Sequence, residues 1–221
     1  MSELATRTAV GVILIAIALA SALFGGTVFA VLIALVATVM YIEWSRMVGH
    51  WGFGWRFTGF FYCLLPAVSL LWIRERAEYQ GIGAGFDLLI WVFLVVWSTD
   101  IGAFFAGRAI GGPKLAPSIS PNKTISGLVG GVIGATVIGG AWVNFASSDS
   151  PTTLPATLYW LAAPFAVAAQ LGDLFESGLK RRAGVKDSGT WLPGHGGLLD
   201  RLDGLVPVAV LTAAMMVVGA L

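Results

Sequence analysis

Charged residues are scarce in this chain, and their scarcity excludes an ordinary soluble domain. Asp, Glu, Lys and Arg make up 11% of the 221 residues, hydrophobic residues make up 57%, and the mean hydropathy is +0.85. Soluble domains carry about 25% charged residues. We therefore expect one all-α, polytopic membrane domain, a helix bundle over 1–221. The net charge of +1 gives no reason to expect nucleic acid as a partner.

Cysteine and histidine are nearly absent. The single cysteine, Cys63, can form no disulfide within the chain, and its apolar neighbours indicate a packed thiol. No HExxH motif and no Cys/His cluster is present, which argues against a zinc site. The sequence also lacks the GxxxxGK[ST] pattern of P-loop NTPases and shows no internal repeat.

Long apolar runs dominate what is present. A bilayer-spanning helix needs about 20 apolar residues, and seven runs meet this loosely: 8–24, 27–48, 57–73, 86–106, 125–146, 156–176 and 203–221. The first run resembles a signal peptide ending at 20–22, but a second span follows almost at once, so we expect an uncleaved helix. Tryptophans near the predicted span ends, among them Trp44, fit an interfacial aromatic belt.

The cations indicate the orientation. With a cytoplasmic N-terminus, 11 of the 13 Lys and Arg residues lie in inside segments, and only Arg74 and Arg76 lie outside. The positive-inside rule predicts such a bias. We therefore expect seven spans in the inner (cytoplasmic) membrane, with the polar loops 107–124 and 177–202 facing the cytoplasm.

One polar stretch, Ser177 to Asp203, interrupts the apolar pattern. It gathers five cations and three acids: Lys180, Arg181, Arg182, Lys186 and Arg201 with Asp187, Asp200 and Asp203. Its Pro-Gly-His-Gly-Gly run at 193–197 cannot continue a helix. A solvated cytoplasmic loop explains the cations but not the acids, the glycines or His195. The stretch therefore favours a site for a charged substrate.

Four carboxylates are predicted to converge just below this surface. Asp100 and Asp173 lie within apolar runs, where acids are costly and usually functional. Asp200 and Asp203 have the i, i+3 spacing that places both on one helical face. Clustered carboxylates repel one another unless a cation neutralises them, and Mg²⁺ suits such ligands together with substrate phosphates. Pairing of each acid with a neighbouring cation is the alternative.

Hydroxyls and a cation precede the glycine-spaced run at 125–146, in Ser118, Ser120, Lys123 and Thr124. A helix N-terminus with free backbone N–H groups favours phosphate. The same residues also suit a plain helix start with a cap. Because the second polar loop lies on the same side, we favour phosphate handling.

These two regions resemble the motifs of the phosphatidate cytidylyltransferase (CDP-diacylglycerol synthase) family. The first motif is Ser177-Gly-Leu-Lys180-Arg181, Lys186-Asp187, Pro193-Gly-His195-Gly196-Gly197 and Asp200-Arg201-Leu202-Asp203. The second is Asp100, Gly107-Arg108, Ser120-Pro121-Asn122-Lys123-Thr124 and Gly127. The resemblance therefore covers 86–221, whereas 1–85 carry no specific motif.

The resemblance implies transfer of a cytidylyl group from CTP to phosphatidate, giving CDP-diacylglycerol and pyrophosphate. It also implies a homodimer in the inner membrane, Mg²⁺ as cofactor and K⁺ as a candidate second cation. It implies metal ligands at Asp173 and at Asp200 or Asp203. The implied catalytic residues are Asp173, Lys180, Arg181, Lys186, Asp187, His195 and Arg201. The implied substrate-binding residues are Asp100, Arg108, Ser120, Pro121, Asn122, Lys123, Thr124, Gly127, Ser177, Gly196 and Gly197.

The residue chemistry suits that reaction. A phosphate monoester has a second pKa of about 6, so the nucleophile is ionised at neutral pH and needs no strong base. The barrier is then mostly electrostatic, and metal plus cations can lower it. Arg201 suits a bidentate phosphate grip. His195 suits either a donor to the leaving pyrophosphate or a brace for the glycine turn.

Two other functions remain open from the sequence. A CTP-dependent lipid kinase would transfer the γ-phosphoryl group to an alcohol such as a polyprenol, and would need a base. A transporter would use Asp100 and Asp173 as relay carboxylates, but transporters tend to have repeated halves and sites near the midplane. The Asp-Gly-x-x-Ala-Arg pattern of CDP-alcohol phosphotransferases is absent.

Overall fold

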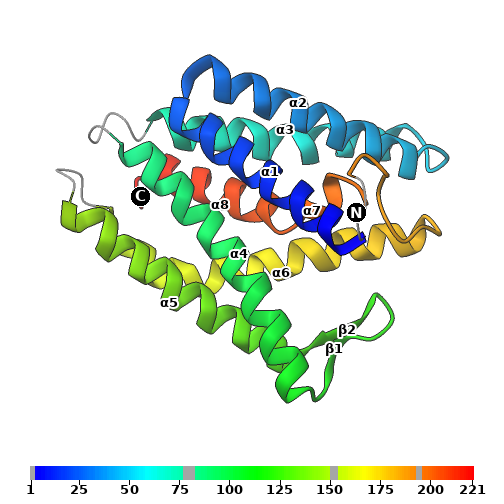
Figure 1. Cartoon of the computed structure of the whole chain (residues 1–221). Helices are drawn as coiled ribbons and strands as arrows, with labels where there is room; N and C mark the ends of the chain where they lie inside the picture. Colours follow the sequence, from blue (N-terminus) through cyan, green and yellow to red (C-terminus); the bar gives the residue numbers. More distant parts are fainter. Residues whose placement is uncertain (1–2, 77–82, 150–153, 193–195) are drawn as a thin grey trace.

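Eight helices and one short hairpin make up the part of the chain that the computed structural model describes, residues 3–76, 83–149, 154–192 and 196–221 (Figure 1). The elements are α1 (Glu3–Phe24), α2 (Gly26–Met47), α3 (Phe53–Arg76), α4 (Ala84–Ile110), β1 (Lys114–Ala116), β2 (Ser120–Thr124), α5 (Ile125–Asp149), α6 (Thr157–Arg182), α7 (Leu199–Leu202) and α8 (Leu205–Val217). The expected helix bundle is confirmed.

The helices lie where the apolar runs predicted spans. Of the described helices, α2 to α6 are long and apolar enough to cross a membrane, while Thr8–Phe24 of α1 and α8 are shorter apolar helices. The 13 residues of α8 extend ~20 Å, less than the ~30 Å hydrocarbon core. The chain is a membrane protein, and the count of seven spans stays a prediction. The turns after α2, α4 and α6 lie at one end of the bundle (Figure 1).

Both polar loops are shorter than predicted, because α4 continues to Ile110 and α6 to Arg182. The last turn of α6 holds three cations, which stabilise the negative end of a helix dipole. Two glycines with left-handed backbones, Gly111 (φ 66°) and Gly112 (φ 99°), end α4. The antiparallel β1–β2 hairpin then fills most of the first loop, a feature that the sequence did not predict.

α4 packs along α5 through glycines. A Cβ atom on Gly102 would lie 2.5 Å from the carbonyl oxygen of Gly130, and one on Gly131 would lie 2.8 Å from that of Thr99. The two backbones therefore touch, as small residues allow in membrane helix pairs. This contact fixes the polar end of α4 against the hairpin and the start of α5.

Two apolar clusters hold the remaining helices together. The larger one includes Trp91 and Phe165 and joins α4, α6 and α8 to parts of α1 to α3. The smaller one includes Trp44, Cys63 and Leu199 and packs α2 and α3 against α6 and α7. Cys63 is 2% exposed, which confirms the packed thiol. The smaller cluster therefore packs next to the polar end of the molecule.

Two residues that the sequence placed at the membrane surface are buried. Trp44 was expected in an aromatic belt, but it is fully buried and its Nε1–H donates to the carbonyl oxygen of Trp55 at 2.8 Å. Arg74 was expected in an outer loop, but it is 8% exposed and its Nε–H donates to the carbonyl oxygen of Ala22 at 2.7 Å. Arg74 therefore satisfies a terminal carbonyl of α1.

The glycine contact between α4 and α5 predicts a large cost for a single methyl group. We expect Gly102→Ala to lower the stability by about 1–3 kcal/mol, because the methyl group meets a backbone carbonyl that cannot rotate away. Thermal unfolding in detergent measures the change. The control is Gly54→Ala, since this helical glycine has open space around its Cβ position, and alanine there should leave stability unchanged or raise it. Equal melting temperatures for both variants would contradict the close packing.

Candidate functional site

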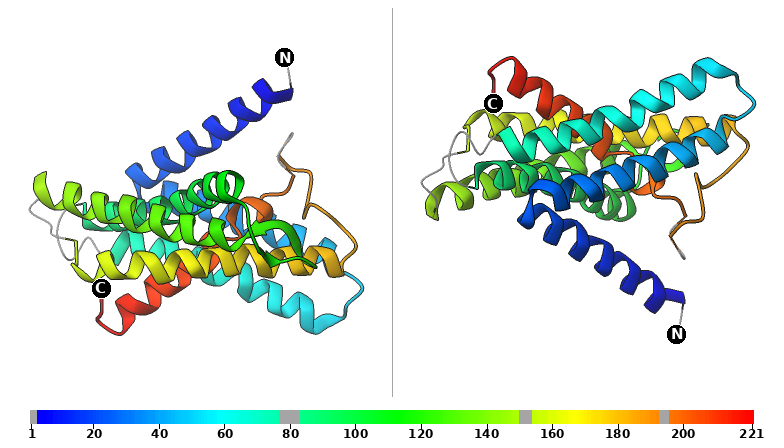
Figure 2. Two further views of the ribbon diagram at one scale, coloured as in Figure 1. Left: turned by 90° about the horizontal axis from the view of Figure 1, so that it is seen from below. Right: turned by 90° about the horizontal axis from the view of Figure 1, so that it is seen from above.

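A cavity of about 1220 Å³ is lined both by polar residues at one end of the bundle and by apolar residues of α1 to α4. α1 leans away from the bundle toward its N-terminus (Figure 2), and the cavity lies beside it. Apolar residues of α1 to α4 line one arm: Leu14, Ile15, Ile17, Ala18, Phe29, Leu32, Ile33, Val36, Leu70, Phe93, Trp97 and Phe104. The cavity thus has an apolar arm and, at its other end, a polar arm.

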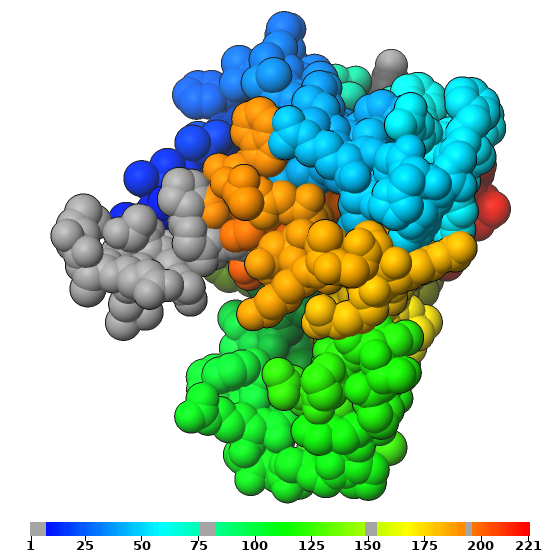
Figure 3. Space-filling view, turned by 90° about the vertical axis from the view of Figure 1, so that its right-hand side faces the viewer, coloured from blue at the N-terminus to red at the C-terminus, as the bar shows by residue number. Residues whose placement is uncertain are grey.

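The polar arm collects most of the predicted site residues. Those that line it are Asp100, Arg108, Asn122, Lys123, Thr124, Gly127, Asp173, Lys180, Asp187, Asp200, Arg201 and Asp203. They come from α4, the hairpin, α5, α6, α7 and the loop between α6 and α7. Figure 3 views this end of the molecule, with the hairpin region in green below the α6 end and the following loop in orange. Residues of both polar segments thus line one cavity.

Other predicted residues lie beside the cavity rather than on its wall. Among the described residues these are Ser120, Pro121, Ser177, Arg181, Lys186, Gly196 and Gly197. The Ser177 hydroxyl donates to Asp173 Oδ1 at 3.2 Å, and Arg181 Nε–H donates to the carbonyl oxygen of Ile119 at 3.3 Å. Lys186 is exposed. His195 lies outside the described residues.

Lys123 ties the hairpin to α6. Its Nζ lies 2.6 Å from Asp173 Oδ2 and donates to Gln170 Oε1 at 3.0 Å. The next residue, Thr124, accepts a hydrogen bond at its Oγ1 from the Gly127 N–H at 3.0 Å. Thr124 therefore caps the start of α5, so this segment is a capped helix start. Its cation nevertheless faces the cavity.

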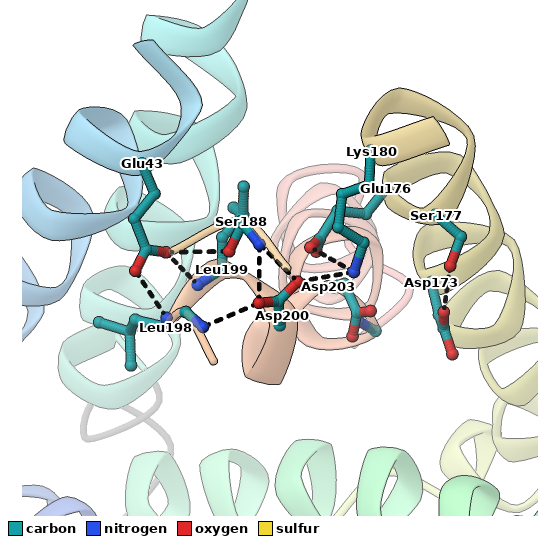
Figure 4. Close-up of polar contacts among 12 residues, drawn as sticks. Glu43, Asp173, Glu176, Ser177, Lys180, Ser188, Leu198, Leu199, Asp200 and Asp203 are labelled. Carbon is teal, nitrogen blue, oxygen red and sulfur yellow. Dashed lines mark hydrogen bonds and ion pairs between the residues drawn. The ribbon is translucent and has the colours of Figure 1, made fainter. Parts of the chain in front are cut away.

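Asp200 binds the loop between α6 and α7 through hydrogen bonds. Its carboxylate accepts from Lys180 Nζ at 2.6 Å, from the Ser188 N–H at 2.9 Å and from the Gly197 N–H at 2.8 Å (Figure 4). Gly196 (φ 82°) turns the backbone close to the same carboxylate. Burial would raise the pKa of Asp200, but these hydrogen bonds, foremost that from Lys180, lower it below its ordinary value. Asp200 is therefore a loop anchor.

Asp203 lies in a different environment, although it follows Asp200 by three residues. One of its oxygens accepts from the Gly204 N–H at 2.7 Å. Its carboxyl group is partly buried and lines the cavity together with Asp173. Asp200 and Asp203 both line the cavity, and the loop amides of Ser188 and Gly197 bind Asp200.

The donor set fits a hard divalent cation with few protein ligands. Within the described residues, no three or more His, Cys, Asp and Glu side chains are grouped as a ready metal cage. Mg²⁺, however, commonly uses one or two carboxylates and takes its other ligands from phosphates and water. Asp173 and Asp203 offer such a pair on the cavity wall. Their mutual charge is what a cation would compensate.

Two buried acids were not identified as candidate site residues from the sequence: Glu43 of α2 and Glu176 of α6. Both are 0% exposed. Glu176 Oε1 lies 3.1 Å from Lys180 Nζ, so Lys180 bridges Glu176 and Asp200. Glu43 hydrogen-bonds the start of α7 (Figure 4). Each lies in an apolar stretch, and the criterion that singled out Asp100 would have found both.

The Asp200 contacts predict that the loop between α6 and α7 opens when the carboxylate is lost. Asp200→Asn replaces an acceptor oxygen with an amide that faces backbone N–H groups, at a cost of about 1–3 kcal/mol. Trypsin cleavage after the exposed Lys186 should then accelerate about 5- to 150-fold. Asp173→Asn is the matched control, since it removes a cavity carboxylate without touching the loop. Equal cleavage rates in the two variants would show that Asp200 does not hold the loop.

The chain is similar to known proteins of one family. A family model described as the cytidylyltransferase family matches residues 50–218. The phosphatidate cytidylyltransferase of Brucella suis biovar 1 is 43% identical over 180 residues, which are 81% of this chain and 62% of that protein. The enzyme of the same name from Haemophilus influenzae is 45% identical over 148 residues, 66% of this chain and 51% of that protein. The chain spans less than two thirds of the length of these relatives. It belongs to the cytidylyltransferase family.

Proposed function

We propose that this chain transfers a cytidylyl group from CTP to phosphatidate, giving CDP-diacylglycerol and pyrophosphate. The observation that carries the proposal is the single cavity with a polar arm and an apolar arm. A reaction between a nucleotide and a lipid phosphate needs both environments at one point. Similar proteins named phosphatidate cytidylyltransferase support the same reaction.

The apolar arm suits the acyl chains of the lipid. Its walls come from α1 to α4, and Arg108 and Lys123 line the same cavity. A lipid with its tails in the apolar arm would therefore present its phosphate to cations. The tails would remain beside helices that are long and apolar enough to lie in a bilayer.

The residues of the polar arm act mainly by neutralising charge. An ionised oxygen of the lipid phosphate forms a bond to the α-phosphorus of CTP, the bond from that phosphorus to the β-phosphate oxygen breaks, and pyrophosphate leaves. No proton has to be removed from the nucleophile, because its second pKa is about 6. Lys123, Lys180 and Arg201 offset the charge of the two anions, and Arg201 has the planar fork for a bidentate grip.

Asp173 and Asp203 would hold Mg²⁺, with Asp200 kept beside them by its loop contacts. When bound, the ion supplies positive charge to the phosphates and to the leaving pyrophosphate. A second cation such as K⁺ and a homodimer form part of the proposal only through the family resemblance. The proposed location is the inner membrane with the polar arm toward the cytoplasm, which the distribution of 11 of 13 cations supports.

The fate of the label in CTP separates this function from that of a CTP-dependent lipid kinase. Purified protein with Mg²⁺, phosphatidate and α-labelled CTP should yield labelled lipid, while γ-labelled CTP should yield labelled pyrophosphate. Asp173→Asn and Asp203→Asn should each lower the rate at least about 100-fold, since each removes a charge needed by the transition state, while leaving the protein inserted and folded. With a polyprenol supplied in place of phosphatidate, γ-label in the lipid would indicate the kinase. Survival of activity within a few-fold in both variants would contradict the metal assignment.

The apolar arm predicts a defect that depends on chain length. Ala18→Phe adds a ring to α1 inside the cavity and should raise the KM for long-chain phosphatidate about tenfold, because overfilling a packed site costs about 1–3 kcal/mol. The KM for a short-chain phosphatidate and for CTP should change little. The matched control is Val12→Phe, since Val12 is 59% exposed and is not among the cavity residues. A similar effect of both variants on all substrates would place the lipid elsewhere.

A further inference from the structure

Glu43 is a buried acid that none of the roles above uses. Its side chain is 0% exposed and lies four residues before the end of α2 at Met47. A carboxyl group in the apolar interior is costly unless specific donors satisfy it. Glu43 lies in a predicted membrane span. Its hydrogen-bond donors cannot be identified from the neighbouring sequence, because all of them lie far away along the chain.

The donors come from both sides of the loop between α6 and α7. Glu43 Oε1 accepts from the Leu198 N–H at 3.0 Å, and Oε2 accepts from the Leu199 N–H at 2.8 Å and from the Ser188 hydroxyl at 3.2 Å. Figure 4 shows these bonds side by side with those of Asp200. One carboxyl group on α2 thus joins Ser188 within this loop to the start of α7.

The glycines of the loop make this contact sterically feasible. A methyl group on Gly189 would overlap Glu43 Oε1, and one on Gly197 would lie 2.8 Å from Glu43 Oε2. Such a separation is too short for a carbon atom without displacement of one group. Neither glycine has a positive φ, so glycine is needed here because other groups approach the backbone closely: Glu43 at Gly189, and Ser188 Oγ together with Glu43 at Gly197.

The anchored segment leads directly into the residues of the polar arm. Ser188 and Gly197, which lie against Glu43 on one side, donate their N–H groups to Asp200 on the other. The amides of Leu198 and Leu199 open α7. Arg201 lies within that short helix and Asp203 follows it, so a shift of the loop would move both relative to α6.

We propose that Glu43 is a positioning residue for the reaction. It holds the loop between α6 and α7, and with it α7, so that Arg201 reaches the substrate phosphates and Asp203 lies where it can hold a cation together with Asp173. Glu43 itself is not among the described residues that line the cavity, so it acts through the loop. The catalytic consequence rests on the proposed function, whereas the anchoring does not.

Glu43→Gln tests the proposal. The side-chain amide of glutamine would point an N–H donor at a backbone N–H, so one of the hydrogen bonds would be lost. We expect kcat for CDP-diacylglycerol formation to fall about 10- to 100-fold, the range found for residues that orient metal ligands, with the KM for phosphatidate changed less than about threefold. Hydrogen exchange should accelerate in peptides containing Leu198 and Leu199 and stay unchanged in α4 and α5. Asp87→Asn is the control, since it removes an acid from the first turn of α4 and should alter neither readout.

Gly189→Ala keeps the acid and tests the same contact from the loop side, so the outcome does not depend on insertion of the Gln variant. It should reproduce the loss of kcat and the local exchange. The proposal is wrong if both properties of a folded variant stay within twofold of the wild type, or if exchange accelerates in all helices alike. A wild-type protein without cytidylyl transfer would overturn the proposed function alone, because the exchange comparison still decides the anchoring.

Discussion

The burial of carboxyl groups near one end of an apolar bundle is the constraint on which the rest of the structure depends. An unpaired charge in such surroundings costs several kcal/mol, and three of the acids have partners on other elements of the fold. Lys123 of the hairpin satisfies Asp173 of α6, Lys180 and two loop amides satisfy Asp200, and the start of α7 satisfies Glu43. These partnerships cross between elements that the sequence keeps far apart. The hydrogen bonds and ion pairs of these acids therefore hold the elements of the polar arm together.

The first two helices gain a clear role from this arrangement. The family match begins at residue 50, and the stretch before it carries no recognisable motif. Nevertheless α1 and α2 line the apolar arm of the cavity, and α2 supplies Glu43. The part of the chain with the motifs provides the charges, and the part without them provides the apolar wall and one loop anchor. In the proposed function, the lipid would bind between these two parts.

Much of the architecture could be predicted from the hydrophobic pattern and the charges in the sequence. The different roles of the individual acidic residues could not. Apolar runs located the long helices, and the depth of Asp173 below the loop indicated that it would meet the acids that follow the loop. The i, i+3 spacing of Asp200 and Asp203 could not show that the loop would bind Asp200, because the donating amides belong to Ser188 and Gly197. Position near a span end could not show that Trp44 would be covered by α3. The partners of Glu43 lie 145 to 156 residues away, a separation that no local pattern reveals.

The central claim is that the polar arm brings the phosphates of both substrates to Asp173 and Asp203. An experimental structure with CTP and Mg²⁺ tests it most directly. The account predicts a cation held by these two carboxylates and the triphosphate, with Lys123 moved from Asp173 onto a phosphate and Asp200 still bound to its loop amides. A triphosphate bound elsewhere, with the Lys123–Asp173 pair intact and no cation between the aspartates, would contradict it.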